Sequence, residues 1–145
     1  MSTTLREITL ENWEECIELK ATPEQSGFVA SNLYSIAESK FQPTFVPLAI
    51  YHDDTMVGFV MYGLDPDDGN YWIYRLLIDA KHQRKGYGRA AISQVIELLK
   101  AKEDCHKVLI GYEPANSEAE NLYTSLGFRK NGMILFGETI AELTF

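Results

Sequence analysis

The chain has 145 residues, 46% hydrophobic and 23% charged, with a formal net charge of −8, which predicts one domain over residues 1–145 with a substantial hydrophobic core. The acidic balance argues against nucleic acid as a partner, because backbone phosphates would be repelled, and it is compatible with a cationic substrate. No apolar run approaches the roughly 18 residues of a membrane span, and the first residues lack the pattern of a signal peptide, so we expect a cytoplasmic protein without a membrane partner.

The first half of the chain is expected to begin with a strand, followed by two helices and a β-hairpin. Asn12 and Glu15 have capping-box spacing, which predicts a helix start at Asn12, and Pro23 predicts the end of that helix. Prolines within residues 41–47 indicate a connection. In chain order, we expect a strand within residues 1–10 that includes Leu5, Ile8 and Leu10, the capped helix, a second helix over about 28–38 with Leu33 on its apolar side, and strands over 48–51 and 57–62.

The second half alternates strands and helices. The capping-box spacing of Ser117 and Glu120 predicts a helix start, and Gly127 is placed to end that helix. In chain order, we expect a strand over 72–78, a helix ending near 102, a strand over 108–112, the helix opened by Ser117, and a hairpin of 133–136 with 140–145 around Gly137 and Glu138. The strand–helix–strand passage from 72 to 112 predicts a right-handed parallel crossover, and hence a mixed α/β sheet with helices on both faces.

A polar loop with two closely spaced glycines joins the strand at 72–78 to the amphipathic helix that follows. Gly86 and Gly88 allow a sharp turn and leave backbone N–H groups uncovered. A helix start adds unsatisfied N–H groups and the positive end of the helix dipole. With Arg84, Lys85 and Arg89 alongside, this arrangement predicts an anion site, most plausibly for phosphate. The alternative is an ordinary strand-to-helix turn whose basic residues are only solvated.

Two segments resemble the GNAT acyltransferase superfamily. The run from Gln83 to Gly88 is similar to its Q/R-x-x-G-x-G/A pyrophosphate loop, and residues 116–128 resemble its N-x-x-A-x-x-L-Y-x-x-x-G-F segment. Both occur in the family's order, with a helix and a strand between them. The resemblance implies a mixed, mostly antiparallel sheet flanked by helices, with a splayed pair of parallel strands, and acetyl-CoA as co-substrate.

The resemblance also implies roles for particular residues. The pyrophosphate would lie on the loop residues Arg84, Lys85, Gly86, Tyr87, Gly88 and Arg89. Pantetheine would pair with the backbone of Leu76, Leu77 and Ile78, and Asn116 would hydrogen-bond the cofactor. Tyr123 would protonate the departing thiolate, a reasonable role for a phenol with a pKa of about 10; without the neighbouring motif, a core aromatic would be the better interpretation.

Within the superfamily, the resemblance is to bacterial spermine/spermidine N-acetyltransferases, which implies a polyamine acceptor and allows a homodimer joined through the apolar C-terminal strand. Glu24, Tyr74 and Glu113 are candidate acceptor-binding residues. The strand position that often carries an acidic residue in these enzymes holds Tyr74, so the general base stays open between a water held by Tyr74 and a carboxylate such as Glu113. Two other functions remain: acetylation of another small amine, amino acid or protein N-terminus, and a non-catalytic acetyl-CoA sensor.

Overall fold

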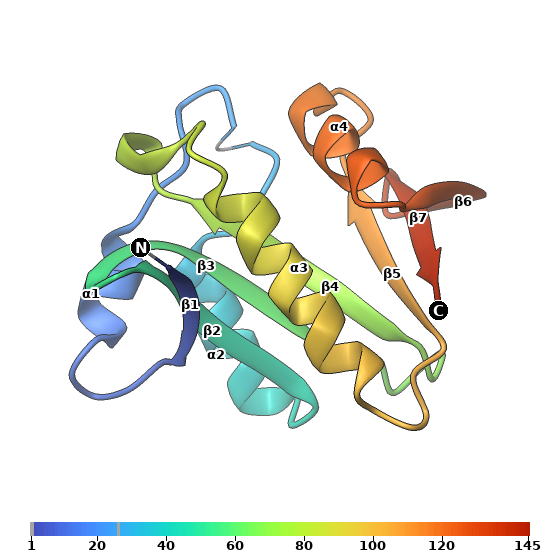
Figure 1. The fold of residues 1–145 in the computed structure, drawn as a ribbon, viewed down its shortest axis with the longest axis horizontal. Coiled ribbons are helices and arrows are strands. Elements are labelled where there is room, and N and C mark those ends of the chain that lie inside the picture. The colour runs from blue at the N-terminus through green and yellow to red at the C-terminus, as the bar shows by residue number, and fades with distance from the viewer. Residues whose placement is uncertain (1, 26) are drawn as a thin grey trace.

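A computed structural model describes residues 2–25 and 27–145 and contains a sheet of seven strands in the order β1-β2-β3-β4-β5-β7-β6 (Figure 1). The strands are β1 (Thr3–Glu7), β2 (Phe45–His52), β3 (Thr55–Leu64), β4 (Tyr71–Ile78), β5 (Lys107–Tyr112), β6 (Arg129–Leu135) and β7 (Glu138–Thr144). The helices are α1 (Trp13–Glu18), α2 (Asn32–Phe41), the 3-10 turn η1 (Ala80–His82), α3 (Tyr87–Lys100) and α4 (Ser117–Ser125).

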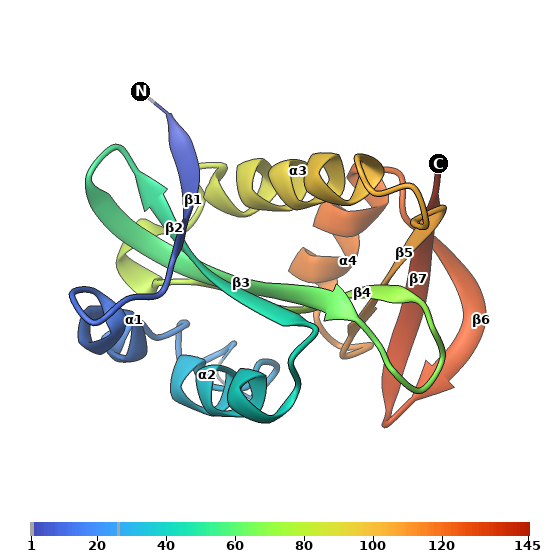
Figure 2. The same ribbon diagram turned by 90° about the horizontal axis from the view of Figure 1, so that it is seen from below.

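The strand directions agree with the prediction from sequence. Every adjacent pair in the sheet is antiparallel except β4 and β5, which run parallel on either side of the crossover through α3. Helices α1 and α2 lie on one face of the sheet and α3 lies on the other (Figure 2). The predicted mixed α/β sheet, mostly antiparallel and covered on both faces, is confirmed.

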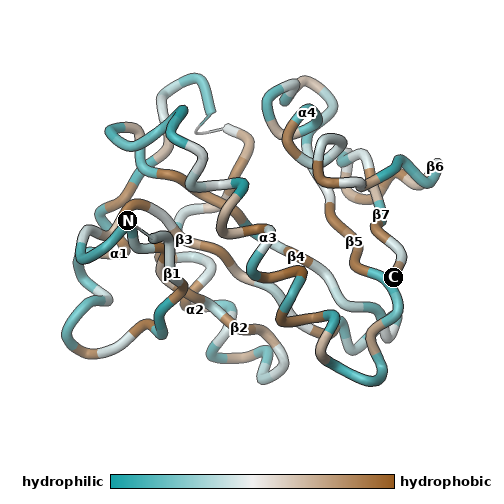
Figure 3. Tube along the Cα trace, in the orientation of Figure 1, coloured by the Kyte–Doolittle hydropathy of each residue, from teal (hydrophilic) through white to brown (hydrophobic). Residues whose placement is uncertain are grey.

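The main core lies between the sheet and α3. The apolar positions predicted for this helix are all buried: Ala91, Ile92, Val95, Ile96 and Leu99. They pack with residues of the central strands and of α4 into one cluster, so α3 and α4 cover the same face. Figure 3 shows this distribution, with the most hydrophobic segments on the central strands and along α3. Burial of this stripe is the main source of the helix's stability, because short helices are marginal without tertiary packing.

Helix α1 begins directly after Asn12, as predicted, but the capping predicted for this helix is wrong, and so are the predicted starts of α2 and α4. Asn12 does not cap α1; its Oδ1 accepts from the N–H of Thr9 at 2.7 Å, a local turn that competes with capping. Helix α2 starts later than expected, at Asn32, because the Ser31 hydroxyl accepts from the third N–H of the helix at 3.1 Å. In α4 the cap is Asn116, which makes Ser117 the first helical residue.

Several strand and surface predictions also need correction. β1 ends at Glu7, and Leu10 is 84% exposed. β2 already begins at Phe45 and includes Pro47; β1 pairs with β2 only from Leu48 onward, so the proline causes no loss of pairing on that side. On α2, Leu33 is 55% exposed rather than part of the apolar side.

The position of the C-terminal strand bears on the expected homodimer. β7 is hydrogen-bonded to β5 on one side and to β6 on the other, so it has no free edge with which to join a second subunit. The edge strand at this end of the sheet is β6. Across residues 2–25 and 27–145, none of the helices combines the length and the hydropathy needed to cross a membrane.

Candidate active site

A cleft opens where β4 and β5 separate. The two strands pair over only three positions, Tyr71–Ile73 with Val108–Ile110, and diverge beyond them, as the gap between their ribbons in Figure 1 indicates. The cleft has a volume of about 1160 Å³ and is lined by both strands, the start of α3, α4 and the start of β7. It exceeds the roughly 300–1000 Å³ of ordinary ligand pockets, which leaves room for a large cofactor and an acceptor. The predicted splayed parallel pair is confirmed.

The glycine loop presents backbone donors to one end of this cleft. Gly86 caps α3 in the left-handed conformation, with φ of 83°, and supplies no side-chain hydrogen bond. The N–H of Ala90 bonds to the carbonyl of Gly86 at 3.1 Å, so the N–H groups before Ala90 belong to the unsatisfied first turn of the helix. That turn contains no acidic residue. The backbone here fits an anion such as a pyrophosphate.

The basic residues of the loop differ in position. Arg84 and Arg89 line the cleft, and each has a partner on α4: Arg84 Nη2 lies 3.6 Å from Glu118 Oε1, and the Arg89 guanidinium donates to the Ser125 hydroxyl. Lys85 is exposed and does not contribute to the cleft wall. The structure therefore brings two of the three predicted cations to the site.

The edge of β4 that faces the gap is set by its pairing with β3. The N–H of Asp79, just after β4, bonds to the carbonyl of Val57 at 2.9 Å, which makes this a hydrogen-bonded pair of the antiparallel ladder. Because bonded and non-bonded pairs alternate, the main-chain groups of Leu77 are directed to β3, whereas those of Leu76 and Ile78 face the gap. The Ile78 carbonyl already accepts from the Gln83 side-chain amide at 2.9 Å. The prediction that pantetheine pairs with β4 is thereby narrowed to the main chain of Leu76 and the N–H of Ile78.

Tyr123, the predicted acid, lies on α4 and contributes to the cleft wall. Its side chain is 7% exposed, and its ring packs 5.9 Å from the Tyr112 ring and 6.0 Å, edge-on, from that of Phe128. Burial raises the pKa of the Tyr123 phenol above its ordinary value of about 10, and the carboxylate of Glu138 adds to the shift. The phenol is therefore protonated at neutral pH and can serve as a proton donor.

Two further candidates have different environments. Asn116 lines the cleft, but its Oδ1 accepts from the N–H of Ala119 at 3.2 Å, which leaves its amide NH₂ as the group available to a cofactor. Glu24 is exposed and lies outside the cleft. Its neighbour Gln25, which sequence reasoning missed, faces the cleft and bonds to Gln83 in the glycine loop at 2.6 Å. In an irregular loop no periodicity indicates which side chain points inward.

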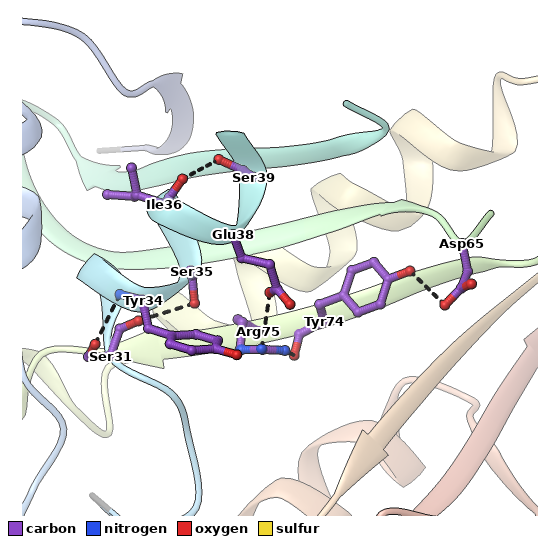
Figure 4. Close-up of polar contacts among 9 residues, drawn as sticks. All are labelled: Ser31, Tyr34, Ser35, Ile36, Glu38, Ser39, Asp65, Tyr74 and Arg75. Carbon is purple, nitrogen blue, oxygen red and sulfur yellow. Dashed lines mark hydrogen bonds and ion pairs between the residues drawn. The ribbon is translucent and has the colours of Figure 1, made fainter. Parts of the chain in front are cut away.

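The other end of the cleft is acidic and aromatic. Tyr74 donates its hydroxyl to Asp65 at 3.1 Å (Figure 4), and the Trp72 indole N–H donates to Asp68 at 3.0 Å. Partial burial and the Asp65 carboxylate raise the pKa of Tyr74 far above that of a free phenol, so this hydroxyl stays protonated and bound to its aspartate. Tyr74, which was predicted to bind the amine acceptor, thus lies in the cleft, and its hydroxyl proton is already donated to Asp65.

Arg75 is the cation at this acidic end. Its Nη2 lies 3.2 Å from Glu38 Oε1 on α2, and its Nη1 donates to the carbonyl of Tyr74 at 3.0 Å (Figure 4). Both charged side chains are largely covered, at 22% and 30% exposed. This ion pair ties α2 to β4 beside the cleft and neutralises the guanidinium.

Glu113 and Glu138 lie together at the cleft wall. Glu113 was a candidate from sequence. Glu138 was missed, because the sequence suggested only that it is part of a hairpin turn, whereas it is the first residue of β7. Partial burial and the neighbouring Glu113 raise the pKa of the Glu138 carboxyl, while Arg75 lowers it. Glu138 reaches the cleft because β7 pairs with β5, a long-range contact that no local pattern in the sequence shows.

A family model and two curated relatives match the amino-acid sequence over most of its length. The model of the Acetyltransferase (GNAT) family matches residues 4–128. The chain is 28% identical to a Bacillus subtilis (strain 168) protein named spermine/spermidine N(1)-acetyltransferase, over 97% of each chain. A probable spermine N(1)-acetyltransferase of Bacillus subtilis subsp. natto is similar to the same extent, with 28% identity over 97% of each chain.

Solved structures share the fold at lower identity. An aminoglycoside acetyltransferase crystallised with coenzyme A superposes with a TM-score of 0.81 at 20% identity, covering 99% of this chain and 95% of the other. The PaiA N-acetyltransferase of Thermoplasma acidophilum, also in complex with coenzyme A, has a TM-score of 0.75 at 18% identity, covering 100% of both chains. The chain belongs to the acetyltransferase (GNAT) family and is an acetyl-CoA-dependent acetyltransferase.

Proposed function

We propose that residues 1–145 form one acetyltransferase domain whose acceptor is a primary amine of a polyamine such as spermidine or spermine. The names of the Bacillus relatives support this substrate class. The observation that carries the proposal is the separation of charge along the cleft. Arg84 and Arg89 line the end at α3, together with Glu118, which pairs with Arg84. The other walls carry the carboxylates Glu38, Asp65, Asp67, Asp68, Glu113 and Glu138.

This distribution suits one anionic and one polycationic ligand. A polyamine carries several ammonium groups, which carboxylates bind through charge-assisted hydrogen bonds and which aromatic faces also attract. Trp72 and Tyr74 supply such faces beside the acidic residues. The one arginine at this end, Arg75, is neutralised by Glu38, so the net charge there remains negative.

In the proposed reaction, acetyl-CoA supplies the acyl group as a thioester. The first-turn N–H groups of α3, with Arg84 and Arg89, hold the pyrophosphate, while the main chain of Leu76, the N–H of Ile78 and the amide of Asn116 orient the pantetheine arm. The acceptor nitrogen loses a proton and forms a bond to the acyl carbon, and the carbon–sulfur bond breaks. The sulfur takes the proton of the Tyr123 hydroxyl, which recovers a proton from the new amide nitrogen.

A direct test is thiol release from acetyl-CoA in the presence of separate acceptors: spermidine, spermine, short diamines, amino acids and a peptide with a free N-terminus. We expect release with the polyamines at the highest kcat/KM. Release with an amino acid or the peptide alone would replace the polyamine with that acceptor class. Binding of acetyl-CoA without thiol release in the presence of any of these acceptors would favour the non-catalytic acetyl-CoA sensor.

A charge variant refines this test. Asp67 lines the cleft, and its contact with Asp65 is through its own backbone N–H, so Asp67→Asn removes a charge and leaves that bond. We expect KM for spermidine to rise up to about fivefold, since a solvent-exposed ion pair is worth up to about 1 kcal/mol, and KM for a monoamine to change less. Asp54→Asn, in the exposed turn between β2 and β3, is the matched control. An equal rise for both amines would exclude this charge from polyamine recognition.

The homodimer stays a prediction, now with β6 as the strand able to pair with a second copy. The exposed apolar side chains of Ile134 and Phe136, in and just after this strand, support it. Sedimentation velocity of the purified protein, compared with a variant carrying Ile134→Lys, measures the oligomeric state. A monomer in both samples would exclude the dimer.

A further inference from the structure

The two faces of β5 differ at the point where the cleft opens. Val108, Ile110 and Tyr112 pack into the core beneath α3, whereas Leu109 packs against residues on the opposite face. Side chains alternate along a strand, so Gly111 belongs to the same face as Leu109. It carries no side chain there, so the backbone of β5 can be approached closely at that position.

The Glu138 side chain occupies the space that a side chain at Gly111 would fill. Its Oε1 lies 2.8 Å, and its Cβ 3.6 Å, from the position of an ideal Cβ on Gly111. Glu138 is the first residue of β7, which pairs with β5 through Gly111 and Ile140. The carboxylate is therefore held against β5 by the register of two paired strands, beside the gap between β4 and β5.

Tyr123 approaches the same cleft from the other side of the sheet. Its ring belongs to the core formed with α3, whereas Gly111 and the carboxylate above it belong to the face of Leu109. Both Tyr123 and Glu138 line the cleft. A proton donor and a proton acceptor thus flank the opening in the sheet from opposite faces.

We infer that Glu138 is the group that takes the proton from the acceptor ammonium before the amine attacks the thioester. This inference rests on the proposed function. The nitrogen–hydrogen bond breaks, its electron pair stays on nitrogen, and the proton moves to a Glu138 oxygen and from there to solvent. Nitrogen then bonds to the acyl carbon while the sulfur leaves with the Tyr123 proton. One proton is released for each amide formed, as the overall reaction requires.

The charged and titratable groups around Glu138 suit this role. Glu113, on the segment after β5, disfavours a second negative charge; Arg75 on β4 favours it; the buried Tyr123 on α4 is neutral. Partial burial is the largest cause, Glu113 adds to it, and together they raise the pKa of the Glu138 carboxyl above its ordinary value. A carboxylate with a raised pKa is a better general base near neutral pH.

Other carboxylates at this end of the cleft already have partners. Asp65 accepts from Tyr74, Asp68 accepts from Trp72, and Glu38 is paired with Arg75. Use of any of them as a base would require loss of a contact that shapes the cleft. Asp67, whose backbone N–H makes its bond to Asp65, and Glu113 are the remaining rivals. The Asp67→Asn and Glu113→Gln variants separate them from Glu138 by experiment.

The first test compares Glu138→Gln with Glu142→Gln. Glu142 lies on the same strand and, four residues along, on the same face, but it is paired with Lys107 at 3.9 Å and lies outside the cleft. With spermidine, or with the best acceptor of the thiol-release panel, we expect Glu138→Gln to lower kcat/KM about 100-fold, the lower range for general-base catalysis. Glu142→Gln should stay within about twofold, and calorimetry should show unchanged CoA affinity in both.

The pH profile separates a base from a structural residue. In the wild type, kcat/KM should rise with pH through the pKa of Glu138 and then level off. In Glu138→Gln that limb should vanish, and kcat/KM should follow the fraction of unprotonated acceptor up to the pKa of the amine itself. The same loss in Glu113→Gln, with a normal limb in Glu138→Gln, would assign the base to Glu113 and overturn the inference.

A pair of acceptors that differ in basicity gives a second readout. The amines of 2,2-difluoro-1,3-diaminopropane are less basic than those of 1,3-diaminopropane and are more often neutral at the assay pH. The defect of Glu138→Gln should therefore shrink at least tenfold with the fluorinated diamine. A defect of equal size with both diamines would show that Glu138 has only a structural role.

Gly111→Ala tests position without removing the charge. The new Cβ would lie 2.8 Å from Glu138 Oε1 and 3.1 Å from Ile140 Cδ1, so the flexible carboxylate must move. We expect kcat/KM to fall at least tenfold while CoA affinity is kept; an unchanged rate would overturn the inference. Absence of turnover in the wild type with any amine would instead reject the proposed function.

Discussion

Replacing Tyr123 with phenylalanine removes one hydroxyl and keeps the ring. The ring contacts with Tyr112 and Phe128, at 5.9 and 6.0 Å, are available to phenylalanine as well. The free energy of unfolding should therefore change by less than about 1 kcal/mol, whereas the cavity left by Tyr123→Ala would cost about 3–5 kcal/mol. The hydroxyl's contribution to turnover can thus be measured in a folded enzyme.

The rate effect follows from the proposed proton transfer. General-acid catalysis contributes about 10²- to 10⁴-fold, so kcat should fall by that factor, equivalent to about 3–5 kcal/mol of activation free energy. Thiol release at saturating acetyl-CoA measures kcat, calorimetry measures CoA affinity, and urea unfolding measures stability. Tyr71→Phe is the matched control, because the Tyr71 hydroxyl bonds to Asp104 outside the cleft at 3.0 Å.

The pH dependence has a definite sign. Tyr123 must be protonated to act as an acid, and burial raises the pKa of its phenol. Loss of activity through its ionisation should therefore begin above pH of about 10, and this limb should be missing in Tyr123→Phe. An unchanged kcat in Tyr123→Phe, with normal stability, would refute the assignment of Tyr123 as the acid.

Three further changes test the cofactor end and the core. Gly86→Val should weaken CoA binding, measured by calorimetry, at least tenfold and should cost about 1–2 kcal/mol of backbone strain. Gly69→Val is the matched control, because Gly69 has a φ of 71°, against 83° for Gly86, and both positions are in open space. This control should be strained to the same extent but should bind CoA normally. Ile92→Ala, fully buried, should lower the free energy of unfolding by about 2–5 kcal/mol, and Leu98→Ala, 46% exposed, by much less in the same urea titration. Asn116→Ala should cost about 1 kcal/mol by loss of the α4 cap; no change in unfolding would contradict the capping role.

Much of the fold could be predicted because its signals are local. The period of Ile92, Val95, Ile96 and Leu99 predicts the buried side of α3, and the same positions are buried in the structure. Errors came where several polar side chains competed for one role. Asn12 and Ser117 both had capping-box spacing, yet Asn12 bonds to a preceding turn and Asn116 takes the cap of α4; spacing alone cannot rank such alternatives.

The sequence by itself determined the order of the elements, the glycine loop at the start of α3 and the family motifs, since each depends on residues close together in the chain. Only the tertiary structure decided which side chains share the cleft. It placed Glu24 and the side chain of Lys85 outside the cleft, and it brought the Glu138 side chain against Gly111 through the pairing of β5 with β7. The physical reason is that strand register is a long-range property: a shift of one residue would turn Glu138 to the opposite face of the sheet.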